Sequence, residues 1–307
     1  MTATTPDPTT PRPGGTARLG ERTVARIGYG AMQLARLHRD PDTALTLLHR
    51  ALDLGIDHID TAQFYGDGLV NDLLRRALDP GDDITLATKI GAAPDPGGPY
   101  PMRPAQRPEE LRADVHTNLR ALGLERIPLV NLRRMDTGAR IPLPEDQRVD
   151  LDDQLATMTA LRDEGLIGAI GLSSIDLDGL RRALPAGIAC VQNAYSLVAR
   201  QDEDLLKLCA AQDIAWVPYF PLGGAFPGLA KVTDEPAVQR AARDLDATPA
   251  QIGLAWLLHH DHRMLLIPGT ATLAHLEANT AAGDIRLDPD TLAALDAVPT
   301  RPLGRIG

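Results

Sequence analysis

The stretch LDDQLATMTALRDEGLIGAIGLSS, residues 151–174, decides the fold of this chain. Its first part, Leu151–Glu164, carries apolar residues at the spacing of a helix with one buried face, and Gly165 follows where helix ends often need a left-handed residue. Its second part, Gly168–Leu172, is a short apolar run, typical of a strand buried on both faces. A helix that leads directly into a buried strand predicts a parallel sheet with helical crossovers.

The same alternation recurs along the whole chain and makes eight strand–helix units. The predicted strands are Arg26–Gly30, His58–Thr61, Ile84–Thr88, Leu129–Leu132, Gly168–Leu172, Cys190–Asn193, Ala215–Pro218 and Leu265–Ile267. The predicted helices are Asp42–Leu54, Leu69–Leu78, Pro108–Leu122, Leu151–Glu164, Leu177–Leu184, Glu203–Gln212, Ala250–His259 and Leu273–Ala282. Eight such units in about 260 residues favour a closed (β/α)8 TIM barrel over an open doubly wound sheet. The turn after the first strand, Gly28–Gln33, also lacks the third glycine of a G-x-G-x-x-G dinucleotide loop.

The regions outside this repeat are predicted to be simple. Residues 1–16 are rich in Thr and Pro and contain no apolar run, so we expect a disordered leader and one barrel domain over residues 17–307. Residues 17–25 predict an N-terminal β-hairpin, and Pro289–Ala297 predicts a last helix. Three long connections follow the carboxyl ends of predicted strands, where the active sites of barrels form: Gly91–Arg107, Arg134–Asp150 and Leu222–Asp234.

The composition argues against several classes of protein. Of the 307 residues, 44% are hydrophobic and 23% are charged, which is typical of a folded globular domain. A formal net charge of −10 and a pI of about 5.2 argue against a nucleic-acid partner. No apolar run approaches the ~18 residues of a membrane span, so no membrane partner is expected. Cys190 and Cys209 stand in apolar segments and are expected to be buried and unpaired, as in a cytoplasmic protein. We expect a monomer or a small homo-oligomer.

Polar residues follow the predicted strands at one end of the barrel, and three of them form an acid–base group. Asp60 and Tyr65 flank the end of the second strand, and Lys89 ends the third. Tyr titrates near ~10 and is a poor proton donor at neutral pH, but a nearby ammonium favours its phenolate form. A carboxylate can hold that ammonium charged and oriented despite burial. Only three of the 31 basic residues are lysines, so we expect Lys89 to do what Arg could not.

Several segments around these residues resemble the motifs of the aldo-keto reductases. Asp60–Gly66, DTAQFYG, is similar to the D-T-A-x-x-Y-G signature, and Ala87–Lys89 is similar to the strand that carries the family's lysine. The other matching segments, in chain order, are Ile170–Ser174, Gln192–Tyr195, Tyr219–Gly223 and Ile267–Thr270, with Asn279 further on. The resemblance covers about residues 17–300 and implies catalytic roles for Asp60, Tyr65 and Lys89.

The resemblance also implies that NADPH binds extended across the mouth of the barrel, with NADH as the alternative cofactor. Ser173, Ser174 and Gln192 would hold the nicotinamide carboxamide, although the family has Asn at the position of Ser174. Tyr219 would stack on the nicotinamide ring. The remaining cofactor contacts that the resemblance implies are Leu222 and Gly223 at the pyrophosphate and Gly269, Thr270, Thr272, His275 and Asn279 at the adenosine end. Gly269 and His275 stand where many members have Lys and Arg.

The end of the fourth predicted strand departs from the family's pattern. Aldo-keto reductases have a catalytic His there, and this chain has Arg133. Arg does not deprotonate at ordinary pH, but it can donate hydrogen bonds to a developing oxyanion. The segment Asn131–Arg133 resembles that of bacterial pyridoxal reductases. The resemblance therefore implies reduction of an aldehyde or ketone, with pyridoxal as a specific candidate, Tyr65 as proton donor and Arg133 as electrostatic stabiliser.

Three alternatives stay open. The chain could reduce a conjugated C=C bond with NADPH, or it could be a nucleotide-binding regulatory barrel without turnover. Arg133 could also form a structural ion pair with Asp60 or another carboxylate at the rim. No metal site is expected, because the run His259–His262 ends a predicted helix, where His suits the helix dipole. Candidate walls of the substrate pocket are Phe64, Tyr100, Met102 and Phe226, with Gln33 as a polar contact.

Overall fold

Seven parallel strands form the central sheet of this chain, for which a computed structural model describes residues 11–79, 81–137, 141–224 and 229–301. In their spatial order, the strands are β11 (Ala215–Trp216), β10 (Ile188–Gln192), β9 (Ile167–Ser173), β8 (Ile127–Arg133), β5 (Thr85–Ile90), β4 (His58–Asp60) and β3 (Tyr29–Gly30). Every neighbouring pair in this order is parallel. Parallel neighbours place all carboxyl ends at the same edge, as the strand–helix repeat predicts.

The segment around the predicted eighth strand closes the sheet into a barrel. Leu265 N donates to Trp216 O at 2.9 Å, and Leu266 N donates to Arg26 O at 2.8 Å. Gly28 N donates to Leu266 O at 2.8 Å on the same side. Residues 264–267 therefore fill the gap between β11 and the first strand region through two isolated parallel bridges, Trp216 to Met264 and Ile27 to Leu266. The predicted (β/α)8 barrel is confirmed.

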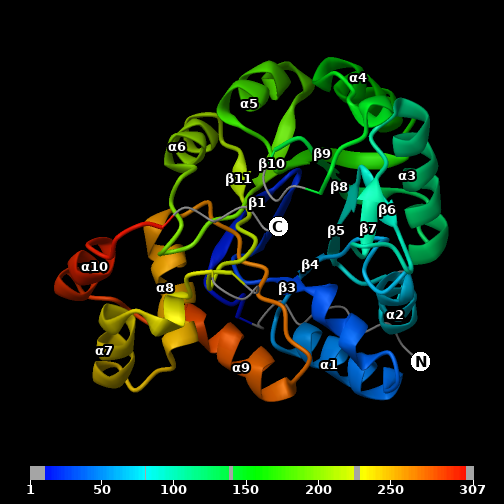
Figure 1. Ribbon diagram of the computed structural model, residues 1–307. Coiled ribbons are helices and arrows are strands. Elements are labelled where there is room, and N and C mark those ends of the chain that lie inside the picture. Colours follow the sequence, from blue (N-terminus) through cyan, green and yellow to red (C-terminus); the bar gives the residue numbers. More distant parts are fainter. Residues whose placement is uncertain (1–10, 80, 138–140, 225–228, 302–307) are drawn as a thin grey trace.

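Helices surround the sheet as a ring, which Figure 1 shows along the barrel. They are α1 (Pro41–Asp53), α2 (Leu69–Ala77), α3 (Pro108–Leu122), α4 (Leu151–Asp163), α5 (Leu177–Ala183), α6 (Glu203–Ala211), α8 (Pro249–His260) and α9 (Leu273–Ala281). Their starts follow local signals: the Asp40 carboxylate accepts from Thr43 N at 3.2 Å, and Thr248 forms a capping box with Gln251. All eight predicted helices are present, with ends that shift by one residue at most.

Other elements were not predicted. Helix α7 (Pro236–Asp244) lies outside the ring next to α10 (Pro289–Asp296), the predicted last helix. Its nine residues, PAVQRAARD, bury Val238, Ala241 and Ala242, so the apolar face is short and two of its three residues are alanines. Within the first long connection, β6 (Ala92–Pro94) pairs antiparallel with β7 (Met102–Pro104). Short 3-10 helices occupy Ala31–Leu37, Glu145–Gln147, Leu184–Ala186, Val232–Asp234 and Ala282–Asp284.

The predicted N-terminal hairpin covers the amino-terminal end of the barrel. It consists of β1 (Thr16–Leu19) and β2 (Arg22–Ala25), and Leu19 and Val24 pack in one cluster with Ala87 and Leu129 from inside the barrel. Residues 11–16, which the predicted leader includes, are described by the structure, and Thr16 already belongs to β1. Residues 12 and 13 contact the barrel directly. Ile27 N donates to Pro13 O at 3.1 Å, and Arg12 forms a 3.0 Å ion pair with Asp57. Residues 1–10 of that predicted leader lie outside the described residues.

Alternation along the strands separates two buried faces. Ala87, Leu129, Cys190 and Leu265 point into the barrel, whereas Ile59, Leu86 and other apolar residues pack against the ring of helices. Cys190 and Cys209 are buried and unpaired, as predicted. Over the ranges that the structure describes, no helix is long and apolar enough to cross a membrane.

Candidate active site

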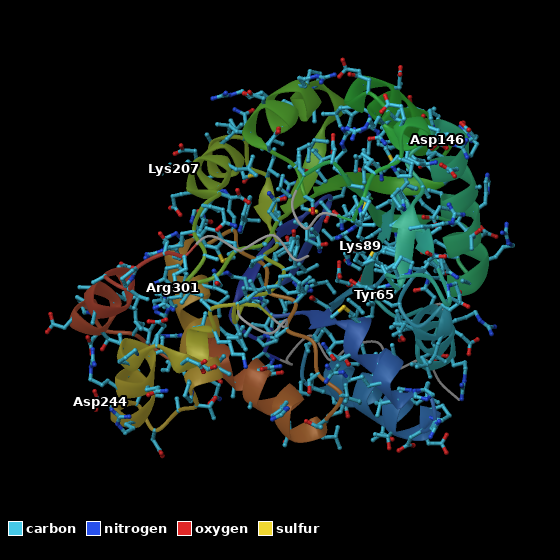
Figure 2. The ribbon with its side chains drawn as sticks, in the orientation of Figure 1. Tyr65, Lys89, Asp146, Lys207, Asp244 and Arg301 are labelled. Carbon is cyan, nitrogen blue, oxygen red and sulfur yellow. The ribbon has the colours of Figure 1, made fainter. Side chains whose placement is uncertain are left out.

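The inward alternation continues to the carboxyl ends of the strands and brings the predicted catalytic residues together. Asp60 lies two residues after His58 on β4, and Lys89 lies two residues after Ala87 on β5. On β8, Leu129, Asn131 and Arg133 are likewise spaced by two. Residues two apart in a strand point to the same face, so all of these side chains enter the barrel. Figure 2 shows Tyr65 and Lys89 inside the ring of helices, far from Lys207 on its rim.

Asp60 and Lys89 form a buried ion pair at the centre of this site. Both are 4% exposed, and the Lys89 ammonium contacts Asp60 Oδ1. The same ammonium donates to Thr61 O at 3.1 Å, and Gln192 Nε2 donates to Asp60 Oδ2 at 2.8 Å. Every oxygen of the carboxylate therefore has a partner, which makes burial of both charges tolerable.

Tyr65 lies beside this pair, in the turn that leads from β4 to α2. Lys89 Nζ is 5.1 Å from the centre of the Tyr65 ring, so the ammonium lies against the phenol. Burial by itself lowers the pKa of Lys89, but the charges and hydrogen bonds of Asp60 and Tyr65 outweigh it, so the pKa is raised. The lysine is thus held as a cation against the phenol, the arrangement that the sequence predicts.

Arg133 is half-buried at the end of β8 and has no carboxylate partner among the described residues. Its Nε is buried without a hydrogen-bond partner, while its carbonyl oxygen accepts from Gln106 Nε2 at 2.9 Å. The alternative of an ion pair with Asp60 is wrong for the described part of the chain, because Lys89 and Gln192 already occupy that carboxylate. The site therefore contains an uncompensated cation beside a neutralised pair.

Two buried polar atoms at neighbouring strand ends also lack partners within the described residues. They are Ser173 Oγ at the end of β9 and Gln192 Oε1 at the end of β10. Ser174 follows in a left-handed conformation (φ 59°), and its Oγ lies 3.2 Å from the Tyr219 hydroxyl. Buried polar groups without partners are costly, so such atoms indicate a place where a polar ligand group completes the hydrogen bonds. They fit an amide such as the nicotinamide carboxamide.

The residues that the sequence assigns to the rest of the cofactor extend from this point in two directions. Leu222 and Gly223 follow Tyr219, and Gly223 has φ 91°, with Ala230 O only 2.3 Å from where a Cβ would stand. The Gly223 amide already donates to Phe220 O at 2.9 Å. The second group lies at the start of α9, where Thr272 caps the helix and Thr270 Oγ1 accepts from Thr272 N at 3.1 Å. Gly269 and His275 are exposed there, and Asn279 is half-buried further along the helix.

Apolar residues gather beside Tyr65. Phe64, Ala62, Ala92 and Met135 form a buried cluster, and Tyr65 and Met102 pack against it. Phe64 and Met102 were both expected as pocket walls, and this cluster places them next to the phenol. Tyr100 is half-buried in the connection between β6 and β7, Gln33 is half-buried after β3, and Phe226 lies outside the described residues.

Four polar residues that touch this machinery were not identified from the sequence. Gln106 bridges Gly91 O and Arg133 O, and Asn71 and Asn118 bond to Thr61 and Thr88 behind the ion pair. His58 is buried two residues before Asp60; within the described residues neither ring nitrogen has a hydrogen-bond partner, and Nδ1 lies 3.9 Å from Asp57 Oδ1. The signal for Asn71 and Asn118 was an amide on the apolar face of a predicted helix, where a hydrophobic residue would be usual.

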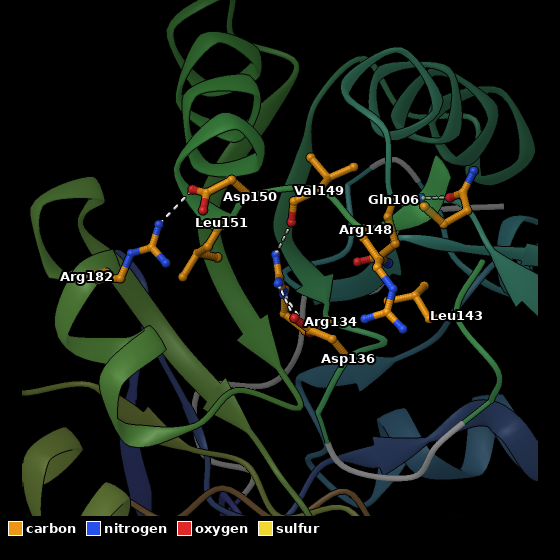
Figure 3. Close-up of a pocket in the computed structure, with 10 residues that line it drawn as sticks. Gln106, Arg134, Asp136, Leu143, Arg148, Val149, Asp150, Leu151 and Arg182 are labelled. Atoms are coloured by element: carbon orange, nitrogen blue, oxygen red, sulfur yellow. Dashed lines mark hydrogen bonds and ion pairs between the residues drawn. The ribbon is translucent and has the colours of Figure 1, made fainter. Parts of the chain in front are cut away.

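A cavity lies at the connection between β8 and α4. It has a volume of about 370 Å³ and is bounded by Arg134, Arg148 and Arg182 together with Asp136 and Asp150 (Figure 3). Arg134 pairs with Asp136, Arg182 bonds to Asp150 at 2.7 Å and Arg148 pairs with Glu145 at 3.2 Å, so all three arginines have carboxylate partners. None of Asp60, Tyr65, Lys89 and Arg133 lines it. The described residues also contain no group of three or more His, Cys, Asp or Glu side chains that could hold a metal ion.

Comparison with known proteins agrees with this geometry. Residues 26–299 match the model of the aldo/keto reductase family. A pyridoxine 4-dehydrogenase of Escherichia coli is 40% identical over 290 residues, which cover 92% of this chain and 98% of that protein. Two structures of aldo-keto reductases from Klebsiella pneumoniae superpose over 94% of this chain. One, with NADPH, covers 96% of its own chain at 27% identity with a TM-score of 0.76; the other, with NADP and acetate, covers 98% at 26% identity with a TM-score of 0.77.

Proposed function

The chain belongs to the aldo/keto reductase family and is an oxidoreductase, and on this premise we propose that it reduces the carbonyl group of a small aldehyde with NADPH. The observation that carries the proposal is the buried contact of Lys89 with Asp60 beside the Tyr65 hydroxyl. A phenol next to a fixed ammonium is a proton donor suited to neutral pH. Tyr65, Lys89 and Asp60 act as one proton-transfer group.

A nicotinamide cofactor is proposed because two buried polar atoms at neighbouring strand ends are available for its carboxamide. Among the described residues, Ser173 Oγ and Gln192 Oε1 have no hydrogen-bond partner. The two Klebsiella pneumoniae structures contain NADPH or NADP. Thr270 and Thr272, with the positive end of the α9 dipole, supply donors for a phosphate at the other end of the cofactor. NADH stays as the alternative, since no Lys or Arg stands at Gly269 or His275.

The cofactor, when bound, supplies a hydride for the carbonyl carbon. Tyr65 donates its hydroxyl proton to the carbonyl oxygen, and Lys89 stabilises the phenolate that remains. Asp60 keeps Lys89 charged and oriented through its own contact and through the hydrogen bond from Gln192. The cluster of Phe64 and Met135 forms an apolar wall that limits the access of water to Tyr65.

Arg133 has the role of a permanent cation in this proposal. It is half-buried and has no carboxylate partner within the part of the chain that the structure describes, so it donates to the oxygen on which negative charge develops or to an anionic substituent of the substrate. It exchanges no proton. A pyridoxal-like aldehyde is the proposed substrate class, and the likeness to a pyridoxine 4-dehydrogenase supports it.

The test is NADPH oxidation with pyridoxal, other aldehydes, ketones and enones as separate substrates. We expect turnover of pyridoxal and related aldehydes. Turnover of enones alone would replace the proposal with C=C reduction. Tight NADPH binding without turnover of any of these compounds would replace it with a regulatory role.

Two variants test the roles within the site. Tyr65→Phe should reduce carbonyl turnover at least about 100-fold and leave NADPH affinity nearly unchanged. Arg133→Met should lower kcat/KM about 100-fold. Arg148→Met, which removes an exposed arginine that pairs with Glu145 at 3.2 Å, is the matched control.

A further inference from the structure

The strands that carry Asp60 and Lys89 are joined on the outside of the barrel as well as on the inside. Asp60 and Lys89 point inward, so their neighbours Thr61 and Thr88 point outward to the helices. Both threonines are fully buried there. A buried hydroxyl group without a hydrogen bond would cost free energy of folding, and each of these two hydroxyl groups has a polar partner from a helix.

Those partners are two buried asparagines. Thr61 Oγ1 donates to Asn71 Oδ1 of α2 at 2.8 Å, and Thr88 Oγ1 donates to Asn118 Oδ1 of α3 at 2.7 Å. Asn71 Nδ2 donates to Asn118 Oδ1 at 3.2 Å, which connects the two pairs. An uninterrupted chain of hydrogen bonds therefore runs from β4 through both helices to β5.

The chain is anchored at both of its ends. Asn71 Nδ2 also donates to Gln63 Oε1 at 2.8 Å, two residues before Tyr65. Asn118 Nδ2 donates to Asp114 O and Asp114 Oδ1 at 2.9 and 3.0 Å. Both amides are completely buried with their donors and acceptors used, and such a network has one low-energy geometry, whereas an apolar contact tolerates sliding.

This network acts directly on the group that holds the proton donor. Thr61 bonds to Asn71 through its side chain, and its carbonyl oxygen accepts from Lys89 Nζ at 3.1 Å. A shift of Thr61 or Thr88 therefore moves the Lys89 ammonium relative to Asp60. The contact between Lys89 and Asp60 joins the same two strands from inside the barrel.

We propose that Asn71 and Asn118 are positioning residues, which set the separation of Asp60 and Lys89 through the hydroxyl groups of Thr61 and Thr88. This inference rests on the proposed carbonyl reduction at Tyr65. It adds that the proton-transfer group is held from behind by two helices. Neither asparagine touches substrate or cofactor.

The test compares two double variants, one that loses the hydroxyl groups of both threonines and one that loses their methyl groups. Thr61→Val with Thr88→Val keeps the shape and removes both hydroxyl groups; Thr61→Ser with Thr88→Ser keeps both hydroxyl groups and removes the methyl groups. We expect the valine pair to lower kcat about tenfold or more, with the KM for NADPH unchanged and the pH profile displaced. The serine pair should retain kcat and lose only stability. Thr85→Val, at the other end of β5, is the control for the substitution itself.

A second readout does not depend on turnover. The chain has only three lysines, so selective ¹³C labelling of lysine side chains resolves Lys89 from the exposed Lys207 and Lys231 by NMR. In the wild-type protein Asp60 and Tyr65 raise the pKa of Lys89 against burial. The valine pair should lower that pKa, because a looser contact leaves the effect of burial less opposed, and the serine pair should not.

These measurements separate the two proposals. If wild type reduces no carbonyl but the pKa of Lys89 still falls in the valine pair, the proposed function fails and the positioning role stands. If the valine pair keeps the wild-type kcat, pH profile and Lys89 titration, the positioning role is wrong. It is also wrong if the serine pair loses as much kcat as the valine pair. Should the valine pair not fold, Thr88→Val alone carries the same comparison.

Discussion

Gln192 Nε2 donates a 2.8 Å hydrogen bond to Asp60 Oδ2, and this bond joins β10 to β4 across the inside of the barrel. The other carboxylate oxygen contacts Lys89, so the orientation of Asp60 is fixed from two sides. The amide oxygen of Gln192 stays unpartnered within the described residues. One side chain thus links the proton-transfer group to the place proposed for the nicotinamide carboxamide.

Gln192→Met should weaken the binding of NADPH, because methionine keeps the length of the side chain and loses the acceptor. We expect Kd to rise about tenfold, the value of one hydrogen bond of about 1.4 kcal/mol. Fluorescence titration of NADPH measures it. Gln201→Met is the control, since the Gln201 amide makes only one long hydrogen bond, 3.5 Å to Ala194 O. An unchanged Kd in Gln192→Met would contradict the proposed carboxamide contact.

Lys89→Arg tests whether the site requires a compact cation. Lys89 is 4% exposed and packed against Asp60 and Tyr65, so the larger guanidinium must displace one of them. We expect a loss of about 1–3 kcal/mol in the free energy of unfolding and a fall in kcat of about 100-fold. Denaturant unfolding and turnover at saturating substrate measure the two effects. Lys207→Arg, at an exposed lysine of α6, should change neither; wild-type turnover by Lys89→Arg would show that charge alone suffices.

Asp114 predicts a dependence of stability on pH. Burial raises its pKa to about 7, against opposing hydrogen bonds from the Gly91 amide and Asn118, whereas an aspartate in an unfolded chain titrates near ~3.9. Between about pH 4 and pH 7 the folded chain therefore binds a proton that the unfolded chain has released. The contribution of this group to stability falls as the pH rises through that window.

Asp114→Asn removes this titration. We expect it to raise the free energy of unfolding by on the order of 2 kcal/mol at pH 8 relative to wild type, and the gain should shrink at pH 5. Urea unfolding of both proteins at the two pH values measures the difference. Asp290→Asn, at an exposed position of α10, should give no such difference. An equal effect of Asp114→Asn at both pH values would refute the assignment.

Gly28→Ala tests the packing below the site. A Cβ at residue 28 would lie 2.2 Å from His58 Nε2, in the interior of the barrel. Since no free space is available, we expect a loss of about 1–3 kcal/mol in the free energy of unfolding. A double-mutant cycle with His58→Ala measures the clash, because removal of the imidazole should cancel part of that loss. Additive losses in the double variant would show that the imidazole is not the obstacle.

Much of the barrel was predictable because its signals are local. Helix α3 has the predicted bounds, Pro108–Leu122, since the proline that begins it and Gly123, which follows its last residue, are both local signals. Helix α7 was missed, because Pro236–Asp244 is only nine residues long and Val238 is the one large apolar side chain that it buries. The hairpin of β6 and β7 was missed because its strands are rich in Pro and pair only with each other.

Some residues of the candidate site were also predictable from local signals, and others were not. Asp60, Lys89 and Arg133 could be found because strand ends of a parallel barrel meet at one edge. Gln106, Asn71 and Asn118 could not, because the partners of a buried amide come from distant segments. Gln106, for example, bonds to Gly91 O, just after β5, and to Arg133 O, at the end of β8.

The order of strands and helices and the inward direction of Asp60, Lys89 and Arg133 were determined by the sequence alone. They follow from the period of two in a strand and from short-range helix signals, which depend on neighbouring residues only. Only the tertiary structure decided that Asp60 has two partners and that Arg133 has none among the described side chains. Hydrogen bonds and ion pairs depend on distances of a few tenths of an ångström between segments, and those distances arise only when the barrel closes and its helices pack.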